Sequence, residues 1–240
     1  MSGRQRVDAA AAFLLHVHPF SESSLILDVF SRSHGRLALL ARGARRPRSA
    51  LRGVLIGFQP LELGWFGNGE VKTLAKAEWT GGLPLLAGRC LLFGYYLNEL
   101  LMKLLPREDA HPALFDAYGQ TLAVLAREGA DTGVLRQFEQ TLLRELGYGL
   151  QLDRAADSGQ PVRADRWYRY EIERGPVEVA ERFDGDGALS GATLLALAGG
   201  DYTDERTAVE SKLLMRQLMN HYLGGQALQS RRIFVELLEL

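Results

Sequence analysis

The hydrophobic pattern of the chain changes near Thr80, and this change constrains the fold more than any other feature. Before it, apolar residues form short or alternating runs bounded by Gly, Pro or Ser, which is typical of β-strands. The spacing of these runs, without a helical period between them, indicates a small antiparallel barrel or sandwich. The five predicted strands are Ala12–His18, Ser24–Phe30, Arg36–Ala41, Val54–Trp65 and Glu70–Glu78.

Two local signals refine the strand prediction. Pro60 lies inside the fourth run, so this strand is predicted to be long and bent or to lie at a sheet edge, because proline cannot donate to a central ladder. The turn Phe66-Gly67-Asn68-Gly69 predicts a hairpin before the fifth strand, because Asn-Gly tolerates positive φ angles.

After Thr80 the apolar residues recur at intervals of three or four, the period of an amphipathic helix. A polar, loop-rich insert at about 153–187 interrupts this pattern. We therefore predict an α+β fold, with a five-stranded β-barrel at residues 1–80 and a mainly α-helical domain at residues 81–240. The predicted helices are Leu85–Leu105, His111–Arg127, Thr132–Leu146, a short helix capped by Ser190 that runs to Leu197, and Thr207–Tyr222; the insert is predicted to hold one two-stranded element, Trp167–Glu173 with Val177–Ala180.

The charge of the chain is unevenly distributed. The formal net charge is −1, with 28 Lys and Arg against 29 Asp and Glu, and this total argues against a nucleic-acid partner. Residues 1–80, however, hold eleven basic and six acidic side chains, whereas residues 81–240 hold seventeen and twenty-three. The asymmetry predicts a basic barrel and an acidic helical domain that bind different partners.

Cysteine content and hydropathy indicate the compartment. The single cysteine, Cys90, excludes an intrachain disulfide and a cysteine zinc site, and it fits a reducing cytoplasm. The longest uncharged run, Gly187–Gly200, has fourteen residues, too few to cross a bilayer. Asp8 and His16 flank the apolar N-terminal run and oppose its reading as a signal peptide. We expect a cytoplasmic, nucleoid-associated protein without membrane contacts.

Motifs for catalysis and cofactor binding are missing from the sequence. It contains no Gly-x-x-x-x-Gly-Lys phosphate loop and no Gly-x-Ser-x-Gly nucleophile turn. His16 and His18 share one face of a predicted strand, but no third ligand is suggested nearby, so a metal role is disfavoured. We therefore expect no enzymatic activity, no cofactor and no metal site.

The segment Arg42–Arg52 is the one constellation that predicts a binding surface. It holds five arginines and no carboxylate, and it lies between two predicted strands, so it is predicted to be an exposed loop. Guanidinium groups fork onto phosphate oxygens, and OB-type barrels bind oligonucleotides through one sheet face and its flanking loops. A solvated loop that maintains solubility is the alternative, which the unbalanced charge and the exclusive use of arginine disfavour.

Residues near this segment are predicted to complete the surface. Phe20 follows the first strand and is the exposed candidate for base stacking, whereas Phe30 and Phe58 are predicted to be core. Lys72 and Lys76 lie four apart on one strand and are predicted to share a face. The predicted DNA-binding set is Arg32, Arg36, Arg42, Arg45, Arg46, Arg48, Arg52, Lys72, Lys76 and Phe20.

Several segments of the chain, in this order and spacing, resemble the RecO family of bacterial DNA repair proteins, which are recombination mediators. The similarity covers almost the whole chain. The segments are Ser21-Glu22-Ser23-Ser24-Leu25-Ile26-Leu27-Asp28-Val29-Phe30, His34-Gly35-Arg36, Ala41-Arg42-Gly43-Ala44-Arg45, Gly69-Glu70-Val71-Lys72-Thr73-Leu74, Tyr96-Leu97-Asn98-Glu99-Leu100, Leu146-Gly147-Tyr148-Gly149 and Tyr222-Leu223-Gly224-Gly225.

The resemblance implies that the N-terminal five-stranded barrel is an OB fold and that the C-terminal domain is helical. It also implies a function and a set of partners. It implies binding of single- and double-stranded DNA, annealing of complementary strands, and, with RecR, loading of RecA onto DNA coated by single-strand-binding protein. Arg136 falls in the segment that is similar to the family's binding region for the acidic C-terminal tail of single-strand-binding protein. Arg136 lies among apolar residues at helical spacing. From this spacing alone, plain helix packing is the favoured interpretation of the segment.

One departure from the family concerns zinc. Some relatives hold zinc through cysteines in the C-terminal domain, but the matching loop here, Asp153–Gly159, contains none. We expect packing and hydrogen bonds to hold this loop instead. An RNA-binding barrel module in translation or RNA processing is the alternative function. The sequence shows no feature that reads a 2′-hydroxyl group, so binding to matched DNA and RNA oligomers separates the two functions.

Overall fold

The computed structural model describes residues 6–180 and 187–238, and the chain divides into two compact units. Unit 1 comprises Met1–Ala130 and Leu228–Leu240, and unit 2 comprises Asp131–Ala227. The chain therefore leaves unit 1 after the third helix and returns to it near its last helix. Each unit is described by itself.

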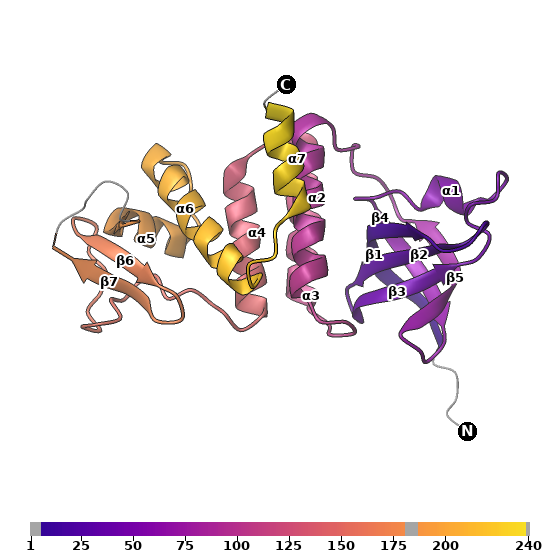
Figure 1. Cartoon of the computed structure of the whole chain (residues 1–240), viewed down its shortest axis with the longest axis horizontal. Helices are drawn as coiled ribbons and strands as arrows, with labels where there is room; N and C mark the ends of the chain where they lie inside the picture. The colour runs from indigo at the N-terminus through magenta and orange to yellow at the C-terminus, as the bar shows by residue number, and fades with distance from the viewer. Residues whose placement is uncertain (1–5, 181–186, 239–240) are drawn as a thin grey trace. The chain divides into compact units, whose positions relative to one another are not determined.

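Unit 1 contains a closed five-stranded barrel, which confirms the predicted fold class (Figure 1). The strand order is β1-β2-β3-β5-β4; β3 pairs with β5 in parallel, and the other neighbours are antiparallel. The strands are β1 (Arg6–Pro19), β2 (Leu25–Ser31), β3 (Gly35–Ala41), β4 (Pro60–Phe66) and β5 (Val71–Trp79).

The inward-facing side chains of the strands fill the barrel. Because side chains alternate along a strand, Leu27 and Val29 of β2 and Leu37 and Leu39 of β3 all point inward and are fully buried or nearly so. Trp65 completes this core from β4. Each such side chain contributes about 1.5–3 kcal/mol through burial, so the alternating pattern of the sequence accounts for the barrel.

The fourth predicted strand, Val54–Trp65, is wrong in its first half. A one-turn helix, α1 (Leu51–Val54), ends at its first residue, residues 55–59 are irregular, and β4 starts only at Pro60. The first residue of a strand is a position where a missing N–H costs little, so the proline marks the start of the strand rather than a bend within it. The predicted hairpin turn between Phe66 and Val71 is confirmed.

Besides α1, unit 1 contains the helices α2 (Gly88–Leu104), α3 (Pro112–Arg127) and α7 (Gln229–Leu238). Phe13 and Phe30 on the outside of the barrel pack against Phe115 and Tyr118 of α3, with ring centroids 5.0 to 6.4 Å apart. Phe30 is therefore buried as predicted, but beneath a helix instead of inside the barrel.

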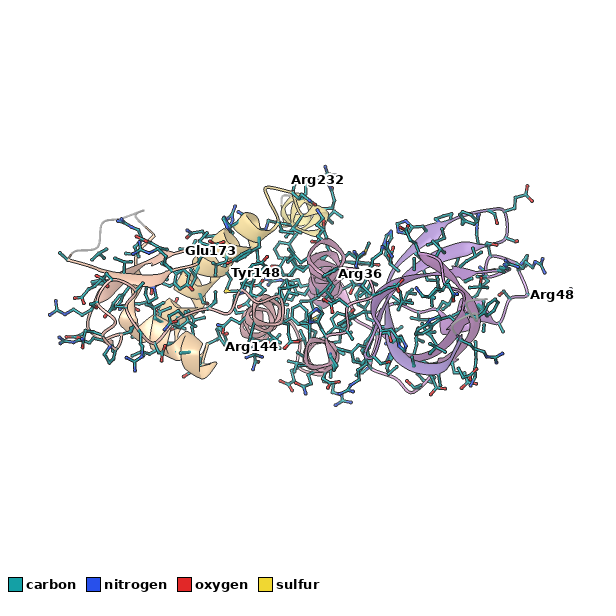
Figure 2. All side chains as sticks on the ribbon, turned by 90° about the horizontal axis from the view of Figure 1, so that it is seen from below. Arg36, Arg48, Arg144, Tyr148, Glu173 and Arg232 are labelled. Carbon is teal, nitrogen blue, oxygen red and sulfur yellow. The ribbon has the colours of Figure 1, made fainter. Side chains whose placement is uncertain are left out.

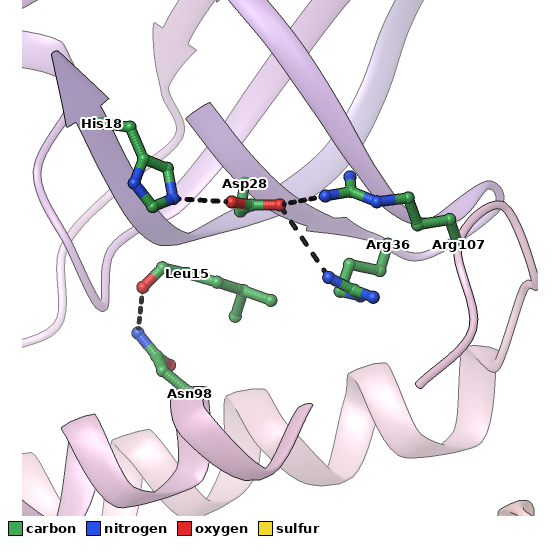
Figure 3. Close-up of polar contacts among 6 residues, drawn as sticks. All are labelled: Leu15, His18, Asp28, Arg36, Asn98 and Arg107. Carbon is green, nitrogen blue, oxygen red and sulfur yellow. Dashed lines mark hydrogen bonds and ion pairs between the residues drawn. The ribbon is translucent and has the colours of Figure 1, made fainter. Parts of the chain in front are cut away.

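A buried asparagine satisfies the backbone where β1 is irregular. The pairing of β1 with β2 shifts register between Leu14 and His16. The side chain of Asn98 on α2 donates to the carbonyl of the intervening residue, Leu15, at 2.8 Å (Figure 3). The hydroxyl of Tyr118 donates in turn to the Asn98 side chain. These contacts satisfy polar groups that burial would otherwise leave unpaired.

The helix α7 was not predicted from the sequence, and a carboxylate on α2 holds its first turn. Glu99 accepts hydrogen bonds from the backbone N–H groups of Gln229 and Ser230, each at 2.9 Å, and from the Ser230 hydroxyl at 2.7 Å. An anion at a helix N-terminus pairs with unsatisfied N–H groups and with the helix dipole. This contact joins residues more than a hundred positions apart in the sequence.

Unit 2 contains helices and a small sheet. The sheet has the order β7-β6-β8, and its first two strands confirm the predicted two-stranded element. Ser190 caps α5 by accepting from the backbone N–H of Thr193, as predicted. Residues 181–186 of the predicted insert lie outside the described residues. The elements are α4 (Thr132–Glu145), β6 (Trp167–Glu171), β7 (Gly175–Val179), β8 (Leu189–Ser190), α5 (Gly191–Gly199) and α6 (Glu205–Tyr222).

The predicted change from strands to helices falls where the barrel ends, after Trp79. As a domain boundary, residue 80 stays a prediction, because unit 1 continues through Ala130. Within the described part of the chain, no helix is both long enough and apolar enough to cross a lipid bilayer.

Replacing Glu99 with Gln tests the contact that holds α7. Burial alone would raise the pKa of Glu99, but the hydrogen bonds from Ser230 and Gln229 and the neighbouring Lys103 outweigh it and lower this pKa. The stabilisation is therefore complete above the ordinary glutamate pKa of about 4.3 and is lost as the pH falls through the lower pKa of the folded state. We expect Glu99→Gln to reduce the free energy of unfolding by about 1–2 kcal/mol at pH 7.

Urea unfolding at several pH values measures this effect. The difference between wild type and Glu99→Gln should shrink below about pH 4, where the wild-type carboxylate is protonated. Glu128→Gln is the matched control, because Glu128 is exposed. A difference that stays constant down to pH 3 would contradict the role assigned to the Glu99 charge.

Candidate nucleic-acid interface

The arginine-rich loop between β3 and β4 is built from consecutive turns. The backbone N–H of Arg46 donates to the carbonyl of Gly43, that of Ser49 to Arg46, and that of Arg52 to Ser49, at 3.0 to 3.2 Å. Gly43 has a φ of +71°, a left-handed conformation that glycine adopts without strain. The turns give the loop a defined path while its arginine side chains point outward.

A second loop lies beside it at the same end of the barrel. Because β2 and β3 are antiparallel and Leu25 pairs with Ala41, the start of β2 and the end of β3 are neighbours. The backbone N–H of Arg45 donates to the Ser23 carbonyl at 3.0 Å, and its guanidinium donates to the carbonyl of Ser21. The loop after β1 and the arginine-rich loop therefore form one surface.

We call this the barrel-end surface, defined by Phe20, Arg42, Arg45, Arg46, Arg48 and Arg52. All six side chains are exposed, and the Phe20 ring is 60% exposed, as predicted. The guanidinium groups of Arg42, Arg46, Arg48 and Arg52 make no hydrogen bond or ion pair with other residues that the structure describes. Arg48 projects away from the barrel (Figure 2). Unpaired guanidinium groups on a projecting loop are available to phosphate.

Two of the predicted basic residues are exposed but already paired. Arg32 forms a two-pronged contact with Asp116 of α3, at 2.9 and 2.8 Å. Lys76 lies 3.0 Å from Glu78 and 3.7 Å from Glu62. The hydrogen bond to Glu78 raises the pKa of Lys76, and that to Asp116 raises the pKa of Arg32. Their charges are therefore largely balanced within the protein.

Arg36 belongs to a polar cluster beside the barrel and is not exposed to ligands. Its side chain is 14% exposed and donates to the carbonyl of Leu105 at 3.2 Å. The carboxylate of Asp28 lies 3.9 Å from Arg36, 3.1 Å from Arg107 and 3.1 Å from His18 (Figure 3). Burial and the nearby Arg107 lower the pKa of Arg36, against the opposing effect of Asp28.

The prediction that Lys72 and Lys76 share a face is wrong. In the β4–β5 pairing Gly64 faces Lys76 and Trp65 faces Leu74, so Ala75 is an extra, bulged residue. The bulge changes the side-chain alternation between the two lysines. Lys72 is 5% exposed and pairs with Glu108, whereas the side chain of Lys76 is 49% exposed. Lys72 therefore does not extend the basic surface.

Arg136 on α4 is also mostly buried. Its side chain is 13% exposed and contacts the fully buried carboxylate of Glu139 at 2.7 Å. The two residues are three positions apart, so they lie on the same side of the helix. Arg136 therefore balances a buried charge, and its predicted contact with an acidic tail is not tested by this geometry.

Several residues that contact the predicted ones were not predicted from the sequence. Arg107 pairs with Asp28, which also lies near Arg36, and the Ser21 and Ser23 carbonyls accept hydrogen bonds from Arg45. Antiparallel pairing of the second and third strands would have been enough to place the two loops together. No local signal identifies Arg107, because its partners lie on distant strands.

The zinc site of some relatives does not fit the residues of this chain. The loop at 153–162 is closed by backbone hydrogen bonds, from Ala155 to Gln160 and from Val162 to Asp153, each 2.8 Å long. Ala155 and Val162 are buried beneath it. The matching positions carry neither the thiolates nor the imidazoles that zinc prefers. Hydrogen bonds and packing hold this loop, as predicted.

His16 and His18 lie on the same face of β1, as predicted, with ring centroids 4.2 Å apart. His18 contacts Asp28. Across residues 6–180 and 187–238, no three side chains of His, Cys, Asp or Glu are grouped so as to hold a metal ion.

Comparison with known proteins assigns the family. The family model "Recombination protein O N terminal" matches residues 8–83, and "Recombination protein O C terminal" matches residues 88–232. The chain is 58% identical over 240 residues to the DNA repair protein RecO of Aromatoleum aromaticum, and 55% identical over 243 residues to those of an Azoarcus species and of Dechloromonas aromatica. Each alignment covers 100% of both chains. The chain therefore belongs to the RecO family of DNA repair proteins.

Proposed function

We propose that this RecO-family protein binds single- and double-stranded DNA through the barrel-end surface. The observation that carries the proposal is the group of exposed arginines without internal partners, beside the exposed ring of Phe20. Arginine side chains neutralise phosphates independently of sequence, and an aromatic ring stacks on any unpaired base. Arg32, Arg36, Lys72 and Lys76 have smaller roles or none in this proposal, because internal contacts occupy them.

Strand annealing follows from the same surface without catalysis. Two complementary strands repel each other through their phosphates, and a basic surface lowers this repulsion when it binds either strand. Base pairing then supplies the free energy, so neither a nucleotide cofactor nor a catalytic residue is needed. The protein acts in this proposal as a mediator and not as an enzyme.

The partners implied by the family complete the proposal. The protein is proposed to act with RecR in the cytoplasm, at the nucleoid, and to help load RecA onto DNA coated by single-strand-binding protein. The excess of carboxylates in residues 81–240 disfavours a second extended DNA-binding surface there and favours contacts with proteins. Arg136 is proposed to contact the acidic tail of single-strand-binding protein, and it must share or leave its pair with Glu139 to do so.

Removing arginines from the loop tests the DNA-binding proposal. Five arginines that contact single-stranded phosphates give a plot of log K against log salt concentration with a slope of about −3.5. We expect the combined change Arg45→Ala, Arg46→Ala and Arg48→Ala to weaken binding to all sequences alike. The slope should flatten to about −1.4, because three phosphate contacts are lost.

The control removes three exposed arginines that are paired within the protein. Arg6, Arg163 and Arg166 contact Asp8, Asp165 and Glu178, respectively, and are replaced together by Ala. Fluorescence anisotropy of labelled DNA and of matched RNA, titrated at several salt concentrations, gives both slopes. An equal change of slope in the control and in the loop variant would refute the assignment to the loop, and tighter binding of RNA would favour the RNA-binding alternative.

A paired substitution separates the two roles of Arg136. Arg136→Ala leaves the buried Glu139 carboxylate without its cation, so we expect the free energy of unfolding to fall by about 3 kcal/mol. Arg136→Met combined with Glu139→Leu replaces the pair with apolar side chains and should recover most of this loss. Chemical unfolding measures both changes.

The folded double variant then tests tail binding. We expect it to bind an acidic, apolar tail peptide more weakly than wild type does, with unchanged affinity for naked DNA. Wild-type affinity for the peptide would mean that Arg136 only balances Glu139.

A further inference from the structure

A cavity of about 220 Å³ lies in unit 2, between the end of α4, the β6–β7 hairpin and the end of α6. Three tyrosines contribute to its lining, and polar side chains lie at its edge. We call it the tyrosine pocket, defined by Tyr148, Gln151, Tyr170, Glu173, Arg174 and Tyr222. Pockets for drug-sized ligands have volumes of about 300–1,000 Å³, so this one suits a single ring system.

Two of the tyrosines already form a stack. The rings of Tyr148 and Tyr222 have centroids 4.2 Å apart and planes inclined by 22°. Tyr148 is 44% exposed, so part of its ring remains open to a further planar group. Gly147 and Gly149 flank it, and a Cβ atom at Gly147 would meet nothing within 4 Å, which leaves the approach to Tyr148 uncrowded.

Hydrogen-bonding groups line the pocket, and an exposed arginine lies near it. Gln151 and Glu173 offer amide and carboxylate groups that can hydrogen-bond to the edge of a base. Burial raises the pKa of Tyr170 to about 12, so its hydroxyl stays protonated and adds no negative charge. Arg144, in the last turn of α4, is exposed and makes no side-chain hydrogen bond or ion pair with other described residues. A Cβ atom placed at Gly149, the residue after Tyr148, would lie 4.0 Å from the Cγ atom of Arg144.

We propose that the tyrosine pocket binds one unpaired base of single-stranded DNA, which stacks on Tyr148 while Arg144 contacts the adjoining phosphate. This inference rests on the proposed DNA-binding function and adds to it a second contact on unit 2. Glu173 repels phosphate, and Arg174 of the lining already pairs with Glu171, so the base enters and the backbone stays at the rim.

The composition of the pocket favours a base over an acidic peptide. An acidic tail would bring carboxylates towards Glu173, which repels them, while Arg174 of the lining already pairs with Glu171. A base has no net charge, offers a flat face to Tyr148 and carries donors for a carboxylate. In duplex DNA every base is already stacked and paired, so the pocket distinguishes single strands from duplexes.

Removal of the Tyr148 ring tests the proposal in the full-length protein. The probe is a short single-stranded DNA that contains 2-aminopurine, whose fluorescence falls when it stacks on an aromatic ring. We expect Tyr148→Ala to weaken single-strand binding by roughly fivefold to a hundredfold, which is the usual effect of losing one stacked base. The fluorescence quenching should be lost as well, and duplex binding should be unchanged.

Two further variants separate stacking from folding and from charge. Tyr148→Phe keeps the ring and should bind like wild type, with the same melting temperature. Arg144→Gln should flatten the salt slope by about 0.7, as expected for one lost phosphate contact on a single strand. Single-strand affinity and quenching that are the same in Tyr148→Ala and wild type would overturn the proposal. Loss of binding to an acidic peptide with retained DNA binding would also overturn it.

The outcome is distinguishable from failure of the proposed function. If the loop variant loses its salt dependence while Tyr148→Ala binds like wild type, the barrel-end surface stands and the tyrosine pocket fails. If Tyr148→Ala weakens binding and the loop variant does not, the pocket binds DNA and the assignment to the loop fails.

Discussion

The carboxylate of Asp28 is the contact on which unit 1 depends. It is nearly buried on the outside of the barrel, and it faces Arg36 of β3, Arg107 after α2, and His18 of β1. A buried charge is tolerated only when it is well paired, so these partners cannot be lost singly without a large penalty. The cluster thereby joins three strands of the barrel to the segment that connects α2 and α3.

The backbone reinforces the same junction. The N–H of Glu108 donates to the carbonyl of Arg36 at 2.8 Å, and Lys72 pairs with the Glu108 side chain. Gly35 has a φ of +66°, and a Cβ atom there would lie 1.9 Å from the carbonyl oxygen of Asp109. Only glycine permits this approach. Ion pairs and close backbone contacts therefore both hold the segment between α2 and α3 against the barrel.

Local pattern determines most of the strands and helices, and it fails where the chain is irregular. Alternation identified the strands of the barrel, but it could not reveal the bulge at Ala75, which reverses the side of Lys76 relative to Lys72. Pro60 was misread because a proline inside an apolar run and a proline at the start of a strand look alike in sequence. Helix α7 is short, and Glu99 holds its first turn from far away in the sequence, so no local signal was sufficient.

The same limit applies to the candidate site. A run of arginines is visible in the sequence, but whether each one is free depends on carboxylates elsewhere in the chain. Arg32 is paired with a residue 84 positions away, and Lys72 with one 36 positions away. The arginines of the projecting loop were easier to predict because a loop built from turns brings few distant side chains near them. Exposed charge on loops is therefore the part of such a site that sequence reveals best.

Because α7 belongs to unit 1 and follows unit 2 in the chain, unit 2 is an insertion within unit 1. This order has a consequence for synthesis on the ribosome. The barrel, α2 and α3 emerge first, yet the surface of α2 that receives α7 stays uncovered until all of unit 2 has been made. During that interval the Glu99 carboxylate lacks the hydrogen bonds that it accepts from the first turn of α7. A nascent chain must therefore keep this surface from aggregation or chaperone capture until α7 (Gln229–Leu238) has been synthesised and has emerged from the ribosome.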